Sequence, residues 1–498
     1  MGKILLKFDN NLKQEDIIIP LIETSGSESG GGRKDPNISG YQQTSVYGIV
    51  VPIVQINNIV VAFNDIKYFQ LESVGHIPTV RVIVNDRYKL HSMIDTPSSD
   101  NKLRVQIIPP CDNTYKKINM TFYITEFNSY DNGTVGVEGV FLCKKFTEGQ
   151  YKAFGEVDTY KLFEDIAKDT SLGFATNIEN SDAQENVLGD KRYMYCDYKS
   201  YQQLFNQEIR RAPNDDTHIY DWWIDLYNNI NLVNVYERYN TVDKDEDMMV
   251  WCTSGRKHYL EDEEQDPIQL PAYIHNNPLL QPSSLFVKNY EKINSFGAQI
   301  SRGTDKVFTI YEVDSNECKS YLIQDGDVKR CNSVMCEYIG EVYGPYNYLK
   351  AEACYDTYKQ KMNLETIRVT LSEPIFGLMR GDKVNFLWFD NDTTTSDKRN
   401  MLEDTGIIQD VNLDVQSITN TNPVDRYGSF EQDMSVSGQY MIVACSVIYE
   451  DYEWKYVLDL QRPSSKTPHL LNLPDTLVNN SNSPSISSNI NIVDSTTK

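Results

Sequence analysis

The chain has 498 residues, enough for about three domains of typical size. Its 71 acidic and 47 basic side chains leave a net charge of −24, and 40% of its residues are apolar. That apolar share supports a sizeable buried core. So negative a charge disfavours a protein that grips DNA or RNA, or one that docks on an anionic membrane. The 33 Tyr residues favour β-structure and broad contact surfaces.

Cysteine usage and hydropathy indicate the compartment. The nine Cys residues are odd in number and widely scattered, which favours buried thiols made in a reducing cytoplasm over a disulfide framework. The apolar run Ile4–Leu6 is too short for a signal peptide. We also find no apolar run long enough to cross a membrane, so we expect no membrane insertion.

Residues 1–150 are predicted to form a first antiparallel β-barrel-like domain, because short runs rich in β-branched and aromatic residues alternate with turn residues. The predicted strands are Val46–Val54, Ile56–Phe63, Thr79–Val84, Leu103–Ile108, Met120–Phe127 and Gly133–Cys143. Asn57-Asn58 and Asp131-Asn132-Gly133 are predicted hairpin turns. The Gly- and Ser-rich segment 25–40 predicts a flexible loop and lacks the Gly-Lys-Ser/Thr ending of a phosphate-binding loop.

Residues 151–240 are predicted to form a small α/β domain. Asp158-Thr159 is predicted to begin a helix that Gly173 ends in a left-handed cap. A second helix is predicted over Ser200–Arg211. The stretch His218–Tyr239 then predicts two strands around a turn at Asn228-Asn229.

The remainder predicts a connection, a second barrel and a tail. Residues 241–345 predict an irregular connection with short strands, since 240–303 is acidic and then Pro-rich. Residues 346–463 predict a second antiparallel β-barrel-like domain with a polar insertion at 391–437. The Ser-, Asn- and Pro-rich residues 464–498 predict an extended, flexible or partner-bound tail. The expected fold class is therefore β-rich α+β. In this second half, a helix is predicted at Tyr346–Lys361, and strands are predicted at Val307–Val313, Lys319–Ile323, Thr366–Leu371, Leu378–Phe389, Gly438–Tyr449 and Trp454–Leu460.

Familiar catalytic and metal-binding motifs are missing from the sequence. There is no His-Glu-x-x-His, no paired Cys-x-x-Cys, no Gly-x-Ser-x-Gly and no Gly-x-Gly-x-x-Gly after a strand. We therefore expect no catalytic residues, no metal and no cofactor.

One stretch has the composition of a site, Asp221-Trp222-Trp223-Ile224-Asp225. Paired carboxylates beside Trp rings are typical of glycoside hydrolases, and alternate residues of a strand share a face, which would put Asp221 and Asp225 together. The interpretation that we favour is a hairpin that buries Trp222, with Trp223 at an inter-domain or subunit contact. Trp222, Trp223 and Asp225 are accordingly candidate contact residues.

Several stretches follow one another in a recognisable order. They are YKLFEDIAKDTSLGFATN, YKSYQQLFNQEI, the hairpin DWWIDLYNNINLV, the barrel entry LSEPIFGLMRGDKVNFLWF and the closing strands GQYMIVACSVIYEDYEWKYVLDLQRP. In this order the chain resembles the central baseplate hub of contractile-tailed bacteriophages, a family shared with the base of type VI secretion spikes. The resemblance covers residues 150–240 and 345–463 best.

The resemblance implies a structural, non-enzymatic protein of the virion tail, assembled in the host cytoplasm. It implies a homotrimer in which two barrels per subunit form a ring of six modules between a six-fold tail tube and a three-fold spike. The implied partners are the tube protein, the spike protein and other baseplate or tail proteins. DNA would pass through the ring without specific binding, in keeping with the negative charge.

Other interpretations stay open at this point. A related hub would also serve a short or non-contractile tail, and a secretion-system spike base has the same resemblance. From a different class, a carbohydrate-active enzyme or a glycan-binding tail protein would use Asp221, Trp223 and Asp225.

Overall fold

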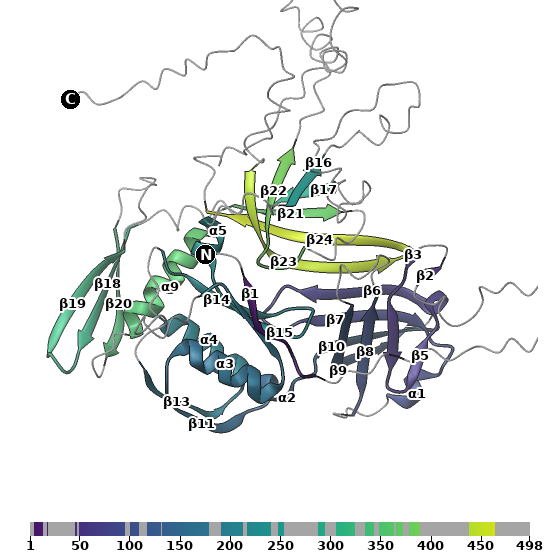
Figure 1. Ribbon diagram of the computed structural model, residues 1–498, viewed down its shortest axis with the longest axis horizontal. Helices are drawn as coiled ribbons and strands as arrows, with labels where there is room; N and C mark the ends of the chain where they lie inside the picture. The colour runs from purple at the N-terminus through teal and green to yellow at the C-terminus, as the bar shows by residue number, and fades with distance from the viewer. Residues whose placement is uncertain are drawn as a thin grey trace, which may run out of the picture.

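A computed structural model gives the fold, which consists mainly of antiparallel β-sheet with few helices (Figure 1). The expected β-rich α+β class is therefore confirmed. The residues described are 4–12, 17, 45–46, 49–94, 100–108, 117–130, 132–178, 191–212, 217–240, 248–252, 287–293, 305–323, 334–342, 348–362, 365–371, 378–388 and 438–463. The predicted loop 25–40, insertion 391–437 and tail 464–498 lie outside them.

The first β region is an antiparallel run in the strand order β6-β7-β10-β9-β8-β4-β5. Its strands are β4 (Ile53–Ile56), β5 (Ile59–Val61), β6 (Ile66–Ser73), β7 (Thr79–Asn85), β8 (Lys102–Ile107), β9 (Ile118–Ser129) and β10 (Thr134–Phe141). The predicted turn at Asn57-Asn58 is confirmed, with Asn57 at φ 52° between β4 and β5. Asn132 and Gly133 of the second predicted turn join β9 to β10, with Gly133 at φ 76°, and Asp131 lies outside the described residues. Strand β6 was not among the strands predicted from the sequence.

The second β region surrounds the long hairpin of β23 (Gly438–Glu450) and β24 (Glu453–Arg462). On one side β24 pairs with β21 (Glu365–Leu371), which pairs with β17 (Val287–Lys292). On the other side β23 pairs with β22 (Lys383–Trp388), which pairs with β16 (Met248–Cys252). Strands β16 and β17 come from the segment 241–345, which was predicted as an irregular connection with short strands, and they pair with strands of this sheet.

The two β regions form one hydrogen-bonded sheet. Strand β23 pairs with β22 through its first residues. Along the same edge, its later residues Cys445 to Glu450 pair with Ser73 to Tyr68 of β6. Apolar side chains from both regions, Leu71 and Val447 among them, lie in one continuous core. Figure 1 shows β23 and β24 (yellow) running alongside β6 and β7. We call this pairing of Tyr68–Ser73 with Cys445–Glu450 the seam. It fixes the two regions relative to each other through the backbone.

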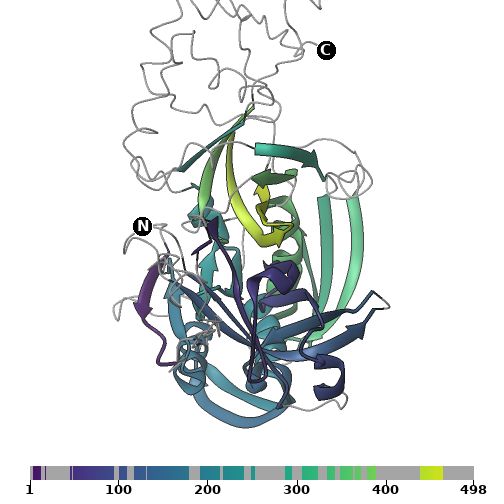
Figure 2. The same cartoon turned by 90° about the vertical axis from the view of Figure 1, so that its right-hand side faces the viewer.

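The α/β module has a mixed sheet in the order β1-β12-β15-β14. Its strands are β1 (Leu5–Phe8), β12 (Gly173–Thr176), β14 (Tyr220–Ile224) and β15 (Asn229–Asn234). Helices α3 (Thr159–Thr170) and α4 (Tyr201–Arg211) belong to this module, as does the two-stranded sheet of β11 (Gln150–Val157) and β13 (Arg192–Lys199) (Figure 2). The segment near the amino terminus thus joins the α/β module as β1.

Helix capping in the module follows the sequence at both helix starts. Asp158 caps α3 by accepting from Lys161 N, and Ser200 with Gln203 forms a capping box on α4. The predicted cap at Gly173 is wrong, because Ser171 takes the left-handed cap at φ 59°. Gly173 instead begins β12, where a Cβ atom would lie 2.0 Å from Asn229 Oδ1.

A correction also applies after β15. The prediction continued the second strand to Tyr239, but the strand ends at Asn234 and α5 (Val235–Asn240) follows. The Asn234 side chain accepts a hydrogen bond from Glu237 N, which favours a helical start at this point.

A three-stranded sheet and a helix complete the described part. The sheet contains β18 (Asp305–Glu312), β19 (Glu317–Ile323) and β20 (Val334–Val342), in the order β19-β18-β20. Helix α9 (Tyr348–Met362) lies between this sheet and α4, where Arg210 pairs with Asp356 and Arg211 with Glu352. Nearer the carboxyl-terminal end of α9, Lys359 pairs with Asp221 of β14. The remaining short elements are β2 (Ser45–Val46), β3 (Ile49–Val50), the 3₁₀ helix Phe63–Asp65, α1 (Leu90–Met93) and α2 (Lys144–Thr147).

Candidate functional site

A cavity of about 330 Å³ lies where four parts of the chain meet. Its walls come from the segment Val74–His76 after β6, from β14, from the end of α9, and from Arg380 with β23 and β24. We call this cavity and its charged side chains the junction. It is the place where the first β region, the α/β module and the second β region touch.

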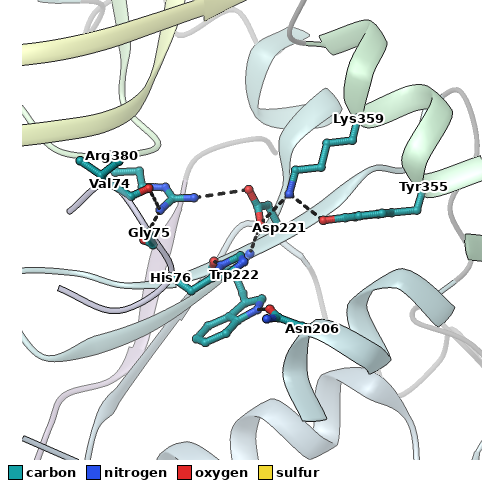
Figure 3. Close-up of polar contacts among 9 residues, drawn as sticks. All are labelled: Val74, Gly75, His76, Asn206, Asp221, Trp222, Tyr355, Lys359 and Arg380. Carbon is teal, nitrogen blue, oxygen red and sulfur yellow. Dashed lines mark hydrogen bonds and ion pairs between the residues drawn. The ribbon is translucent and has the colours of Figure 1, made fainter. Parts of the chain in front are cut away.

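Asp221 of β14 is the central charge of the junction (Figure 3). Its Oδ1 lies 3.2 Å from Lys359 Nζ, and its Oδ2 lies 3.5 Å from Arg380 Nη2. Burial alone would raise the pKa of this carboxyl group, but Lys359 and Arg380 outweigh burial and hold its pKa at about 2. Asp221 is therefore an anion that ties α9 and the second β region to the α/β module.

Arg380 connects the second β region to the first. Its Nη1 donates to Gly75 O at 2.6 Å, and its guanidinium lies 4.7 Å from the ring centroid of Trp223. Gly381, at φ +91°, allows this close approach, because a Cβ atom there would lie 2.8 Å from Trp223 Cζ2. Burial lowers the pKa of Arg380, and Asp221 opposes that shift.

Lys359 and His76 differ in charge. Lys359 Nζ donates to Tyr355 Oη at 2.6 Å, and although burial opposes its charge, Asp221 raises its pKa overall. His76 stacks on Trp222 with centroids 4.6 Å apart, and its Nδ1 lies 2.6 Å from Trp222 O. Since a carbonyl accepts, Nδ1 carries the proton. Burial lowers the pKa of His76, so this ring is neutral near pH 7.

The two neighbouring Trp residues point to different places. Trp222 is fully buried in the α/β module, where its Nε1 donates to Asn206 Oδ1 at 2.9 Å and its ring lies 4.9 Å from that of Phe205. Trp223 is 3% exposed and faces Arg380 across the junction. Within the part of the chain that the structure describes, Trp223 Nε1 has no hydrogen-bond partner.

Asp225 does not share a strand face with Asp221, because β14 ends at Ile224 and Asp225 lies in the turn. Its Oδ1 accepts from the backbone N–H groups of Tyr227 and Asn229 at 2.8 and 2.9 Å. Its Oδ2 accepts from the side-chain amides of Asn229 and Asn231 at 3.0 and 3.2 Å. Burial raises the pKa of Asp225, and the N–H donors oppose that shift. The carboxylate therefore holds the turn of the hairpin together.

Sequence reasoning identified Asp221 and the two Trp residues but missed His76, Lys359 and Arg380. These residues come from three segments far apart in the chain, so no local spacing connects them. The only local signal is that Arg380 precedes Gly381-Asp382 in a turn of otherwise apolar surroundings.

Within the described ranges, no group of three or more His, Cys, Asp and Glu side chains is placed to hold a metal ion. Over the same residues, none of the helices combines the length and apolar character needed to span a bilayer. Chemically, the junction offers a set of charges around a partly open cavity, in which the Lys359 side chain is 31% exposed and the Arg380 side chain 10% exposed.

Comparison with known proteins gives similarity to solved structures alone, since no family model and no curated protein matches the sequence. The chain is similar to a tail protein from Neisseria meningitidis MC58, with 10% identity, a TM-score of 0.47, and coverage of 83% of this chain and 96% of the other. It is similar to the 43 kDa tail protein of prophage MuSo2 from Shewanella oneidensis, with 11% identity, a TM-score of 0.46, and coverage of 83% and 99%.

A third similar structure is an E. coli component of the type VI secretion system, with 7% identity, a TM-score of 0.36, and coverage of 82% and 77%. All three likenesses are to solved structures at 11% identity or less.

Proposed function

We propose that the chain is a structural component of a phage tail, a homotrimeric hub that adapts a six-fold tail tube to a three-fold spike. The proposal is supported by the order of its sequence segments, which resembles the baseplate hub family. Its expected place is the virion tail, and its expected partners are the tube protein, the spike protein and other tail proteins.

The observation that carries the proposal is the seam between β6 and β23. A trimer that presents six modules to a six-fold tube needs two β regions per subunit held at a fixed angle. Backbone hydrogen bonds between β6 and β23, from the pair Cys445 and Ser73 to the pair Glu450 and Tyr68, hold the two regions in a fixed orientation within one chain. The junction adds a second tie between the same regions through Arg380 and Gly75.

Charge supports a passive conduit for DNA. With a net charge of −24, the chain is unsuited to binding a polyanion, and a channel lined by carboxylates repels DNA that passes through it. The conduit is tested by replacing channel-facing acidic residues with Asn or Gln in assembled tails. Slower DNA ejection is expected, and an unchanged rate contradicts this part of the proposal.

The carbohydrate-active alternative gains no support from the geometry. The Asp225 carboxylate is occupied by four N–H donors, and Asp221 is held between two cations. Trp223, at 3% exposure, has no open ring face for a sugar.

A base of a type VI secretion spike, the other alternative, shares the trimeric arrangement and differs in its partners.

The mass of the purified chain in solution tests the hub proposal. Because one chain is 57.3 kDa, a trimer is about 172 kDa (3 × 57.3). Light scattering at several concentrations is expected to give the trimer mass, either alone or when a candidate spike protein is added. A chain that stays at 57.3 kDa under both conditions contradicts the proposal.

A further inference from the structure

The junction holds more positive than negative charge among the described residues. Two cations, Lys359 and Arg380, share one carboxylate, Asp221. Asp459 also lines the cavity, but Arg368 binds both of its oxygens, at 2.8 and 3.0 Å. His76, the remaining titratable group on the wall besides Tyr220, is neutral near pH 7 because burial lowers its pKa. Arg380 is 10% exposed, and a buried charge without a full partner is unfavourable, so an anion that enters here is stabilised.

Hydrogen-bond donors remain for such an anion. The ammonium of Lys359 has three N–H bonds, and the described contacts use two of them, toward Asp221 and Tyr355. The Nη2 group of Arg380 reaches Asp221 only at 3.5 Å, the outer limit of a hydrogen bond. Both cations therefore have capacity for one more oxygen ligand, and both line the cavity.

Another part of the cavity wall is aliphatic. Ile219, Val235, Met362 and Met441 line it and form one packed cluster. Methionine side chains adapt readily to the shape of a bound group. A volume of about 330 Å³ is at the small end of the range for ligand sites, which suits a group of a few heavy atoms or one to two side chains.

We propose that the junction cavity binds an aliphatic carboxylate, with the carboxylate between Lys359 and Arg380 and the hydrocarbon against Met362 and Met441. A carboxylate matches the single charge that the site lacks. A phosphate carries more charge than the site lacks and would lose hydration against the aliphatic wall. The proposal goes beyond the tail role and does not depend on it.

Two sources share this chemistry, a free short-chain carboxylate and the carboxyl-terminal residue of a partner protein with an aliphatic side chain. Two probes distinguish them. Hexanoate represents the free acid, and acetyl-leucyl-leucine represents a chain terminus. Tighter binding of hexanoate identifies a free acid as the ligand, and tighter binding of the peptide identifies a partner terminus.

The test is calorimetric titration of the full chain with both probes, with hexanol and hexylamine as uncharged and cationic controls. Lys359→Met is expected to weaken binding of the carboxylate at least about tenfold, because one charge-assisted hydrogen bond is lost. This variant leaves Asp221 and Arg380 paired one to one, and its unfolding transition checks that it folds. Lys359→Arg is expected to restore most of the affinity.

Lys455→Met is the matched control, since Lys455 pairs with Glu450 on the β23–β24 hairpin and does not line the cavity. It is expected to bind like the parent chain. The proposal is overturned if neither probe binds, if hexanol binds as tightly as hexanoate, or if Lys359→Met leaves the affinity unchanged.

Discussion

The seam and the junction join the same parts of the molecule by different means. At the seam, β6 and β23 pair through backbone groups over six residues of each strand, and side chains behind them, such as Leu71 and Val447, are fully or nearly fully buried. At the junction, three charged side chains from distant segments carry the contact. A seam of this kind tolerates changes of pH and of single polar residues, whereas the junction depends on each charge. We therefore expect the junction, but not the seam, to be sensitive to pH and to the loss of a single charge.

The largest effect is expected from Asp221→Ala. It leaves Arg380 buried and Lys359 half-buried without their anion, which costs about 4 kcal/mol in the free energy of unfolding. Chemical denaturation of the full chain measures this loss. As a control, the double variant Asp221→Ala with Lys359→Met removes a charge of each sign and is expected to recover part of the stability. A loss below about 1 kcal/mol would show that the junction does not join the modules.

Leu71→Ala at the seam is expected to cost about 3 kcal/mol, because it opens a cavity in the continuous core. Unlike the loss at Asp221, which becomes smaller as pH falls from 3.8 to about 2, this loss does not depend on salt or on pH, since no charge is involved. The same denaturation series at two salt concentrations and two pH values distinguishes the two sites. A salt-dependent loss for Leu71→Ala would contradict the contrast.

Acid is expected to weaken the junction and leave the seam intact. The pKa of Asp221 falls from an ordinary value of 3.8 to about 2 in the folded chain. A carboxyl group with a depressed pKa stabilises the fold above its unfolded pKa, and that stability is lost as pH falls from 3.8 to about 2. The expected loss is about 2 kcal/mol, and it should be absent in Asp221→Asn. Equal acid sensitivity in both chains would place the titrating group elsewhere.

The smallest effect is expected from Trp223→Phe, about 1 kcal/mol, because no described hydrogen bond is lost and most of the ring remains over Arg380. Its matched control is Trp222→Phe, which also deprives Asn206 of its donor and is expected to cost about 2 kcal/mol. Thermal unfolding of both variants shows which substitution costs more. A larger loss for Trp223→Phe than for Trp222→Phe would contradict the different surroundings described for the two rings.

The parts of the fold that local chemistry determines were predictable. Helices α3 and α4 begin at Asp158 and Ser200, where side-chain caps and apolar spacing coincide. The turns at Asn57 and Gly133 have residues that adopt positive φ. The β14–β15 hairpin was also recognised, although its second strand ends earlier than expected.

Long-range pairing was not predictable from the same signals. Strand β6 alternates buried Phe69 and Leu71 with polar Gln70 and Glu72, but nothing in it indicates β23 as its neighbour. The junction likewise draws His76, Asp221, Lys359 and Arg380 from four segments, so its chemistry exists only after the modules meet. The boundaries expected for the separate domains and the trimeric state remain predictions.

The seam is tested most directly by a disulfide across it. Gln70 and Ile448 are direct partners on β6 and β23, and both are half-buried. Directly opposed residues of an antiparallel pair lie within reach of a disulfide. The double variant Gln70→Cys with Ile448→Cys is therefore expected to form that bond on mild oxidation, as read by peptide mass mapping.

The control pairs Gln70→Cys with Lys455→Cys, because Lys455 faces Ile448 from β24 and lies one strand further away. Two strand spacings, about 10 Å, exceed the span of a disulfide, so no bond is expected there. A disulfide between the two introduced thiols in the test variant alone is the predicted result. If that bond does not form, or if it forms equally in the control, the claim that the two β regions form a single sheet is contradicted.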